Sequence, residues 1–259
     1  MKKGIVFLLI VFTFGFSIPK QERAFDVGEF VKFRIHYGLI NAGYATIEVQ
    51  EAVKNNKKVY HAVGKGYTTG MSRFFFKVDD TYESYFDKET GKPYQFLRRI
   101  DEGGYTKNQE GFFNQATNKV LVKDYKHKAE ATFPVTENVQ DIMSTFYYLR
   151  NYPEIDVMKV GESVLVDMFF DNEITKFKLK YIGIDNIKTK FGTVPCMVFR
   201  PLVQSGRIFK EQESLTVWIS KDDNKVPISI RANLLVGSIK ADIDAVKGLK
   251  YPLKIIAKP

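Results

Sequence analysis

Three carboxylates stand close together in the first half of the chain, at Asp79, Asp80 and Glu83. Hydrolysis of a glycosidic bond needs two carboxylates that face each other across a cleft. In a strand, Asp79 and Glu83 would lie on one face and Asp80 on the other. Acidic β-proteins commonly offer such pairs, and no phosphate loop, dinucleotide fingerprint or nucleophile elbow accompanies this one. We therefore predict no catalytic residues, and no enzyme.

The histidines and the cysteine give no sign of a metal centre. His36, His61 and His127 are isolated in strand-like segments, and no two of them have the i, i+4 spacing of a helical metal site. Cys196 is the only cysteine, which excludes an internal disulfide and argues against zinc. Because the segment 194–199 around it is apolar, we predict a buried thiol. No metal and no cofactor are expected.

Two arginines occupy corresponding strand ends, Arg98 and Arg231. Arginine pairs with buried carboxylates or with anionic head groups through its planar fork of donors, so both are weak candidates for ligand binding. The alternative is an ordinary exposed arginine at the end of each strand. His36 is the third weak candidate. It lies on the face opposite Val31 and Phe33, which is either solvent or the inside of a barrel.

Strands must position these side chains, because apolar and polar residues alternate with period two through most of the chain. The clearest runs are 31–37, 176–181 and 235–243. Turn signals such as Asn55-Asn56 and Gly103-Gly104 separate the runs at the spacing of hairpins. We predict an all-β, mainly antiparallel fold, either a curved open barrel or a two-lobed β-sheet wrapped around one helix.

That helix is predicted where the apolar residues recur at helical intervals instead, at about residues 138–151. Asn138 and Asp141 have the spacing of a capping box, and Pro153 follows the end. The apolar face of this helix must pack on the sheet. A second segment, 70–76, reads either as a short helix or as an insertion.

The segments on the two sides of the helix resemble each other. Val27-Gly28-Glu29 recurs as Val160-Gly161-Glu162, and the turn 87–93 recurs as 220–227. The same offset of 133 positions separates the members of both pairs up to residue 225. The two explanations are a duplicated β-unit and the chance recurrence of turn residues.

We therefore predict one domain, 18–259, with possible duplicated lobes at 26–134 and 158–247. A seam between two such lobes, covered by the helix, is a natural place for a cavity.

The first residues predict export. Lys2-Lys3 precede an apolar run, 5–16, that is shorter than the roughly 20 residues a spanning helix needs. Small residues then end the run, so we assign 1–17 to a signal peptide cleaved after Ser17. No cysteine lies near this junction to carry a lipid. We expect a soluble protein, periplasmic or secreted, without a lipid anchor.

The composition bounds the partners. The net charge is +9, and the basic residues are spread over the whole chain instead of forming one block. No nucleic-acid motif is present, and none is expected in an exported protein. Such a charge fits a protein that is peripheral to an anionic membrane at most, or simply a lysine-rich surface. Aromatic residues make up 14% of the chain, enough for a large core and a lined cavity.

Three signatures, in order, resemble a known family. They are the segments 35–45, with Ala42-Gly43 at the first hairpin, 141–150, and 218–239, with Trp218 near its start. The chain is similar in these to an uncharacterised family of exported bacterial proteins, domain of unknown function 3108. The resemblance covers nearly the whole chain after the signal. It implies an exported, mainly antiparallel β-protein, and it brings neither an activity nor site residues.

The leading functional hypothesis is non-enzymatic binding of an apolar or amphipathic molecule of the cell envelope, such as a lipid or a lipid-linked glycan. It rests on the export signal, the aromatic content and the barrel-like pattern. The first alternative is an envelope assembly or scaffold protein, which would have a solid core and an exposed apolar patch. The second alternative is a polysaccharide hydrolase that uses Asp79, Asp80 or Glu83.

Overall fold

The computed structural model describes residues 23–203, 215–234 and 237–257. The predicted signal peptide, 1–17, and its cleavage point after Ser17 lie outside the described residues. None of the helices within the described ranges is long and apolar enough to cross a membrane.

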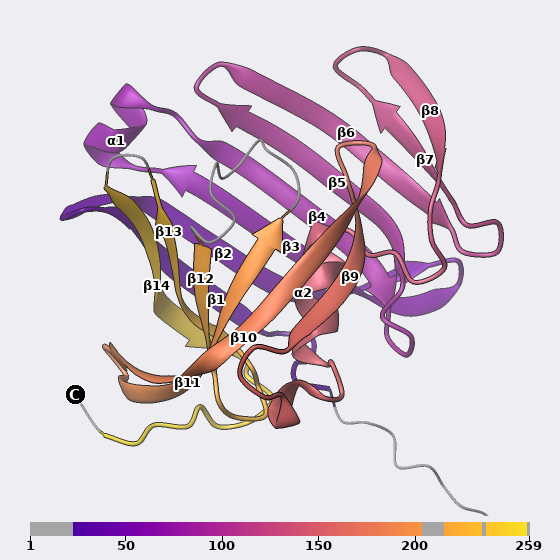
Figure 1. The fold of residues 1–259 in the computed structure, drawn as a ribbon. Coiled ribbons are helices and arrows are strands. Elements are labelled where there is room, and N and C mark those ends of the chain that lie inside the picture. The colour runs from indigo at the N-terminus through magenta and orange to yellow at the C-terminus, as the bar shows by residue number, and fades with distance from the viewer. Residues whose placement is uncertain (1–22, 204–214, 235–236, 258–259) are drawn as a thin grey trace, which may run out of the picture.

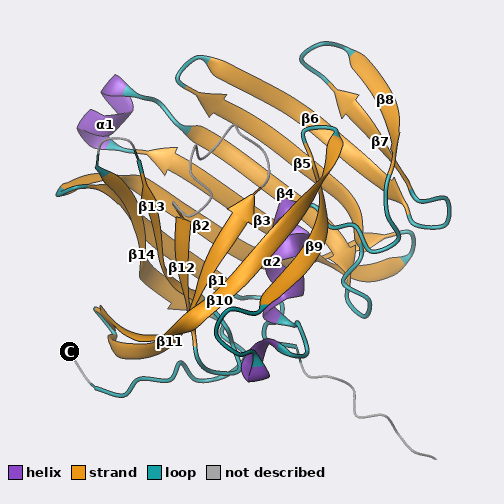
Figure 2. Cartoon of the chain, viewed as in Figure 1, coloured by secondary structure: helices purple, strands orange, loops and turns teal. Residues whose placement is uncertain are grey.

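Fourteen strands of the described chain form one sheet, in which every neighbouring pair is antiparallel (Figures 1 and 2). The order is β8-β7-β6-β5-β4-β3-β2-β1-β14-β13-β12-β11-β10-β9. The strands are β1 (Phe30–Tyr37), β2 (Ile40–Lys54), β3 (Lys57–Thr68), β4 (Asp79–Asp87), β5 (Pro93–Glu102), β6 (Tyr105–Asn114), β7 (Lys119–Asp124), β8 (Ala129–Pro134), β9 (Ser163–Phe170), β10 (Glu173–Thr189), β11 (Gly192–Val203), β12 (Leu215–Ser220), β13 (Pro227–Asn233) and β14 (Ser238–Lys247). The predicted mainly antiparallel all-β class is confirmed.

The sheet is open, because its edge strands β8 and β9 do not pair with each other. It bends so that β9 comes back over β5: the rings of Phe96 and Phe169 lie 6.1 Å apart between centroids. Gln140 forms a short parallel β-bridge with the free edge of β9. Gln140 N donates to Asp167 O, and Phe169 N donates to Gln140 O, both at 2.8 Å. Successive side chains of a strand point to opposite faces of the sheet. In β9, for example, Val164 faces the core and Leu165 is exposed.

The helices are α1 (Gly70–Phe75), α2 (Ile142–Arg150) and the short 3₁₀ helix η1 (Ile155–Val157). The predicted start of α2 at 138 was wrong by four residues. Gln140 is held extended by β9, so the cap is Asp141, whose carboxylate accepts a hydrogen bond from Ser144 N at 2.9 Å. Ser144 Oγ in turn accepts from Asp141 N, which completes a capping box one turn later than predicted.

Helix α2 lies between the two parts of the sheet (Figure 1). Met143 and Tyr147 pack with Phe25 and the buried side chains of β2, β3 and β4. Leu149 packs with η1 and with the buried side chains of β9 to β12. Both parts of the sheet therefore use one helix to complete their cores.

The segments that resemble each other in sequence also form the same local structure. Gly28 and Gly161 both have positive φ, 94° and 97°, which favours glycine. Gly28 N donates to Val49 O at 2.8 Å, and Gly161 N donates to Tyr181 O at 2.9 Å. The two turns therefore share a backbone conformation and a hydrogen-bonding pattern, and the duplication stays a prediction.

Candidate functional site

An apolar cavity of about 280 Å³ lies between α2, η1 and the inner face of β9 to β13. Apolar side chains of the helices and strands make nearly all of its wall. They include Leu149, Ile155, Met168, Phe177, Leu179, Val217, Ile219 and Ile230. The cavity lies beside the helix, but the second half of the chain supplies all of its strands, so it does not lie at the seam where the sequence placed a possible cavity.

One residue of this wall carries a buried hydroxyl without a hydrogen-bond partner. Thr145 lines the cavity from α2 and is 4% exposed, and its Oγ1 has no hydrogen bond in the structure. A buried hydroxyl without a partner costs free energy. At the rim, Lys225 is buried along its stem, while its Nζ pairs with the exposed Asp156 at 3.0 Å. An apolar chain with one polar group fits this wall.

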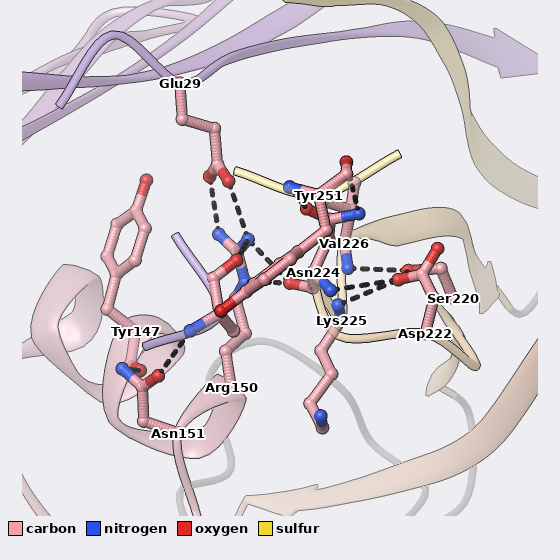
Figure 3. Close-up of polar contacts among 11 residues, drawn as sticks. Glu29, Tyr147, Arg150, Asn151, Ser220, Asp222, Asn224, Lys225, Val226 and Tyr251 are labelled. Atoms are coloured by element: carbon pink, nitrogen blue, oxygen red, sulfur yellow. Dashed lines mark hydrogen bonds and ion pairs between the residues drawn. The ribbon is translucent and has the colours of Figure 1, made fainter. Parts of the chain in front are cut away.

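The end of α2 at the cavity is fixed by a buried ion pair (Figure 3). Arg150 donates from Nη1 and Nη2 to the two carboxylate oxygens of Glu29, at 2.5 and 2.7 Å. Both side chains are 1% exposed. Arg150 also donates to the carbonyl oxygens of Asn224, at 2.7 and 3.1 Å, and Ala24, at 3.3 Å. These acceptors belong to the N-terminal segment and to the turn between β12 and β13, both far from α2 in the sequence.

Asn224 carries this network to the C-terminal segment (Figure 3). Its side-chain amide donates to Tyr251 O and accepts from Tyr251 N, both at 2.9 Å. Asp222 Oδ1 accepts from Asn224 N and from Ser220 Oγ and shapes the turn between β12 and β13. Arg150 therefore joins the N-terminal segment, α2, the β12–β13 turn and the C-terminal segment beside one wall of the cavity.

Of the three weak candidates for ligand binding, Arg98 occupies the most elaborate site. It is 9% exposed, and its Nη1 donates to Asp171 Oδ1 at 2.8 Å, while Lys107 bonds the same oxygen. Its guanidinium lies 4.2 Å from the ring centroid of Phe170. Burial alone would raise the pKa of Asp171, but the bonds from Lys107 and Arg98 outweigh it and lower that pKa. Arg98 thus fastens the β9–β10 turn onto β5 and β6.

Arg231 and His36 lie elsewhere, on two strands that are separated by β14. Arg231 is exposed on β13, and His36 is partly exposed on β1. Both are in register with Lys240 of β14, which lies between them. Because Ile230 lines the cavity, Arg231 points to the opposite, outer face of the sheet. Arg231, Lys240 and His36 form a basic row on that face, and the structure does not bring this row together with Arg98.

The three carboxylates do not face one another across a cleft. Glu83 points to one face of β4, where it bonds His61 at 2.8 Å and Arg99 at 3.1 Å. Asp80 is buried on the other face and accepts a hydrogen bond from the backbone of Asp101 at 3.1 Å. Asp79 is exposed and pairs with Arg73. The alternation predicted for this segment is confirmed.

Asp80 has another partner, Glu102 at the end of β5, which the sequence spacing did not reveal. The hydrogen bond between the two carboxyls, followed by burial, raises the pKa of Glu102 to about 7. One proton shared between two neighbouring carboxyls is the arrangement that produces such a shift.

This pair predicts a loss of stability as the pH rises from about 4.5 through about 7. A carboxyl whose pKa rises on folding stabilises the folded state below its ordinary value of 4.5, and this contribution disappears as the pH passes through about 7. Glu102→Gln keeps a donor toward Asp80, so urea unfolding should show a smaller fall in stability between pH 5 and 8 than in the parent protein. An equal fall in both proteins would contradict the shared proton.

The remaining candidates lie in structural positions. Cys196 is fully buried in β11, and burial raises the pKa of its thiol to about 12. His127 bonds Asp124 in the β7–β8 turn at 2.9 Å. Among the described residues, no group of three or more histidine, cysteine and acidic side chains is placed to hold a metal ion.

The fold and the cavity define a class: an open antiparallel sheet that bends around helix α2. The chain belongs to a family of proteins of unknown function, DUF3108, whose model matches residues 32–244. The family predicted from the three sequence signatures is thereby confirmed. No curated protein matches the chain in sequence.

Three solved structures are similar to the chain at low sequence identity, and the first of them shares its fold. A β-barrel-like protein of domain of unknown function DUF1849 from Brucella abortus is 10% identical, with a TM-score of 0.58, over 87% of this chain and 99% of that one. A DUF1089 family protein from Pseudomonas aeruginosa is 7% identical, with a TM-score of 0.37, over 73% and 89%. A Bacteroides fragilis protein with a YmcC-like fold is also 7% identical, with a TM-score of 0.36, over 86% and 97%.

Proposed function

We propose that this protein binds an apolar or amphipathic molecule of the cell envelope, without catalysis, in the cavity between α2 and β9 to β13. The observation that carries the proposal is the apolar wall with one unpartnered hydroxyl, that of Thr145. Small-molecule sites commonly combine such walls with a few placed polar groups. A scaffold with a solid core, the first alternative, would have no reason to keep this space.

The size of the cavity limits the ligand. At about 280 Å³ it lies just below the roughly 300–1,000 Å³ of sites that enclose a drug-sized molecule. It is nearly twice the roughly 150 Å³ of an apolar cavity that accepts benzene. One acyl or isoprenoid chain end fits it, whereas a complete lipid does not. The polar head of the ligand would lie outside, near Lys225.

The direct test is native mass spectrometry of the mature protein after gentle purification, followed by extraction and identification of lipids. We expect a bound molecule with one apolar chain that remains until detergent or organic solvent removes it. A protein that carries nothing, and that also takes up no fatty acid or isoprenoid alcohol after removal of detergent, would overturn the proposal.

Thr145→Val should separate the roles of the cavity wall. Removal of a buried hydroxyl without a partner is expected to raise the free energy of unfolding by about 1 kcal/mol. The same change should weaken binding of a fatty alcohol but not of the matching alkane. Ser84→Ala is the control, because Ser84 Oγ bonds Asp141 at 2.6 Å and its loss should destabilise the protein. A destabilised Thr145→Val protein would show that the hydroxyl has a partner.

A further inference from the structure

Large apolar side chains gather at one tip of the sheet, away from the cavity. Met71, Phe74 and Phe75 of α1 are 76%, 88% and 77% exposed, and Leu39 in the β1–β2 turn is fully exposed. The two segments are joined, since Thr69 N at the start of α1 donates to Ala42 O of β2 at 3.1 Å. Figure 1 shows α1 standing out at this end of the sheet.

The sheet holds the tip in place. Phe76, just after α1, packs over Gly103, where an added Cβ would come within 2.4 Å of the ring. Arg73 of α1 pairs with Asp79 at 3.1 Å at the start of β4. Since contacts on its inner side fix α1, the outward exposure of its aromatic residues is a feature of the folded chain, and folding alone does not need it.

Basic side chains lie at the tip and on the strands that lead to it. Arg73 and Lys77 flank the aromatic run, and they pair with Asp79 and Asp101. The basic row of His36, Lys240 and Arg231 lies on the strands that lead to this end, and His36 is three residues from Leu39. The whole chain has a net charge of +9. Such a charge draws a protein toward an anionic lipid surface before any apolar contact forms.

We propose that this tip inserts into the surface of a bilayer that contains anionic lipid. Exposed aromatic and aliphatic side chains beside cations are the composition of elements that lie in the membrane interface. The side chains protrude from a helix and a hairpin turn instead of lining a groove, and a bilayer accepts a convex apolar knob without a matching shape. The inference goes beyond the proposed function, because insertion of the tip needs no ligand in the cavity.

The experiment measures co-sedimentation of the mature protein, from residue 18 onward, with vesicles of phosphatidylglycerol and phosphatidylethanolamine. Phe74→Ser/Phe75→Ser should weaken partitioning at least about 30-fold, because two exposed aromatic rings no longer leave water. Val53→Ser/Leu165→Ser is the matched control, with two apolar residues of 65% and 66% exposure far from α1 in the strands; it should bind as the parent does.

A second variant guards against misfolding. Phe74→Trp should show a blue shift of its emission on anionic vesicles, weaker in high salt, whereas Val53→Trp should show none. Equal binding by the serine variant and the parent would overturn the proposal. So would sedimentation of the free protein as an oligomer that only the α1 variant disrupts, since a second copy would then cover the tip.

Discussion

Replacement of Arg150 by methionine is expected to lower the free energy of unfolding by about 3–5 kcal/mol, the cost of breaking a buried ion pair by removing one partner. The carboxylate of Glu29 would remain 1% exposed without its counter-charge. The carbonyl of Asn224 would also lose its donor, and the link from α2 to the C-terminal segment passes through that residue. Urea unfolding followed by circular dichroism measures the change.

Two further variants separate this cause from a general effect of losing an arginine. Arg231→Met removes an exposed arginine on the outer face and should change stability by no more than about 0.5 kcal/mol. Glu29→Leu/Arg150→Met removes both charges and should recover much of the loss. If the double variant is as unstable as the sum of the single variants, the two side chains do not act as a pair.

The second large effect is expected on ligand binding. Val217→Phe places an aromatic ring in the cavity, so it should weaken the binding of a fatty acid at least about 100-fold, because the ring occupies space that the chain would fill and close packing tolerates no overlap. The protein should remain folded, since filling a cavity adds apolar contacts. Isothermal titration calorimetry of the delipidated protein measures the affinity.

The control for Val217→Phe is Leu165→Phe. Leu165 is 66% exposed on β9, with its side chain on the face opposite the cavity-facing Met168, so the larger ring meets only solvent. The affinity of the Leu165→Phe variant for the fatty acid should equal that of the parent protein. Retained affinity in Val217→Phe, with a folded protein, would place the ligand elsewhere.

Much of the fold could be predicted because the alternation of apolar and polar residues along each strand matches which face of the sheet is buried. The run from Val31 to Tyr37 became β1, and the helical intervals became α2. The start of α2 could not be predicted from spacing, because two capping boxes fit the sequence: Asn138 with Asp141, and Asp141 with Ser144, which is the one observed. A contact far along the chain, between Gln140 and β9, decides between them.

The candidate site was harder to predict, because its parts are brought together only by the curvature of the sheet. Arg98 and Arg231 look alike in sequence, yet one is buried against Asp171 and the other is exposed. Arg150 was not singled out, although an arginine directly after the apolar residue Leu149 at the end of a buried helix was an available signal. Its partner Glu29 is 121 residues away, and no local pattern connects them.

The most direct test of the central claim is a methyl NMR titration of the delipidated protein with a medium-chain fatty acid. We predict saturable shifts for the methyl groups of Leu149, Met168 and Ile230, which line the cavity. The methyl groups of Val59 and Val120, buried in other parts of the core, should not change. Shifts that do not saturate, or that appear only away from α2 and β9 to β13, would contradict binding in the cavity.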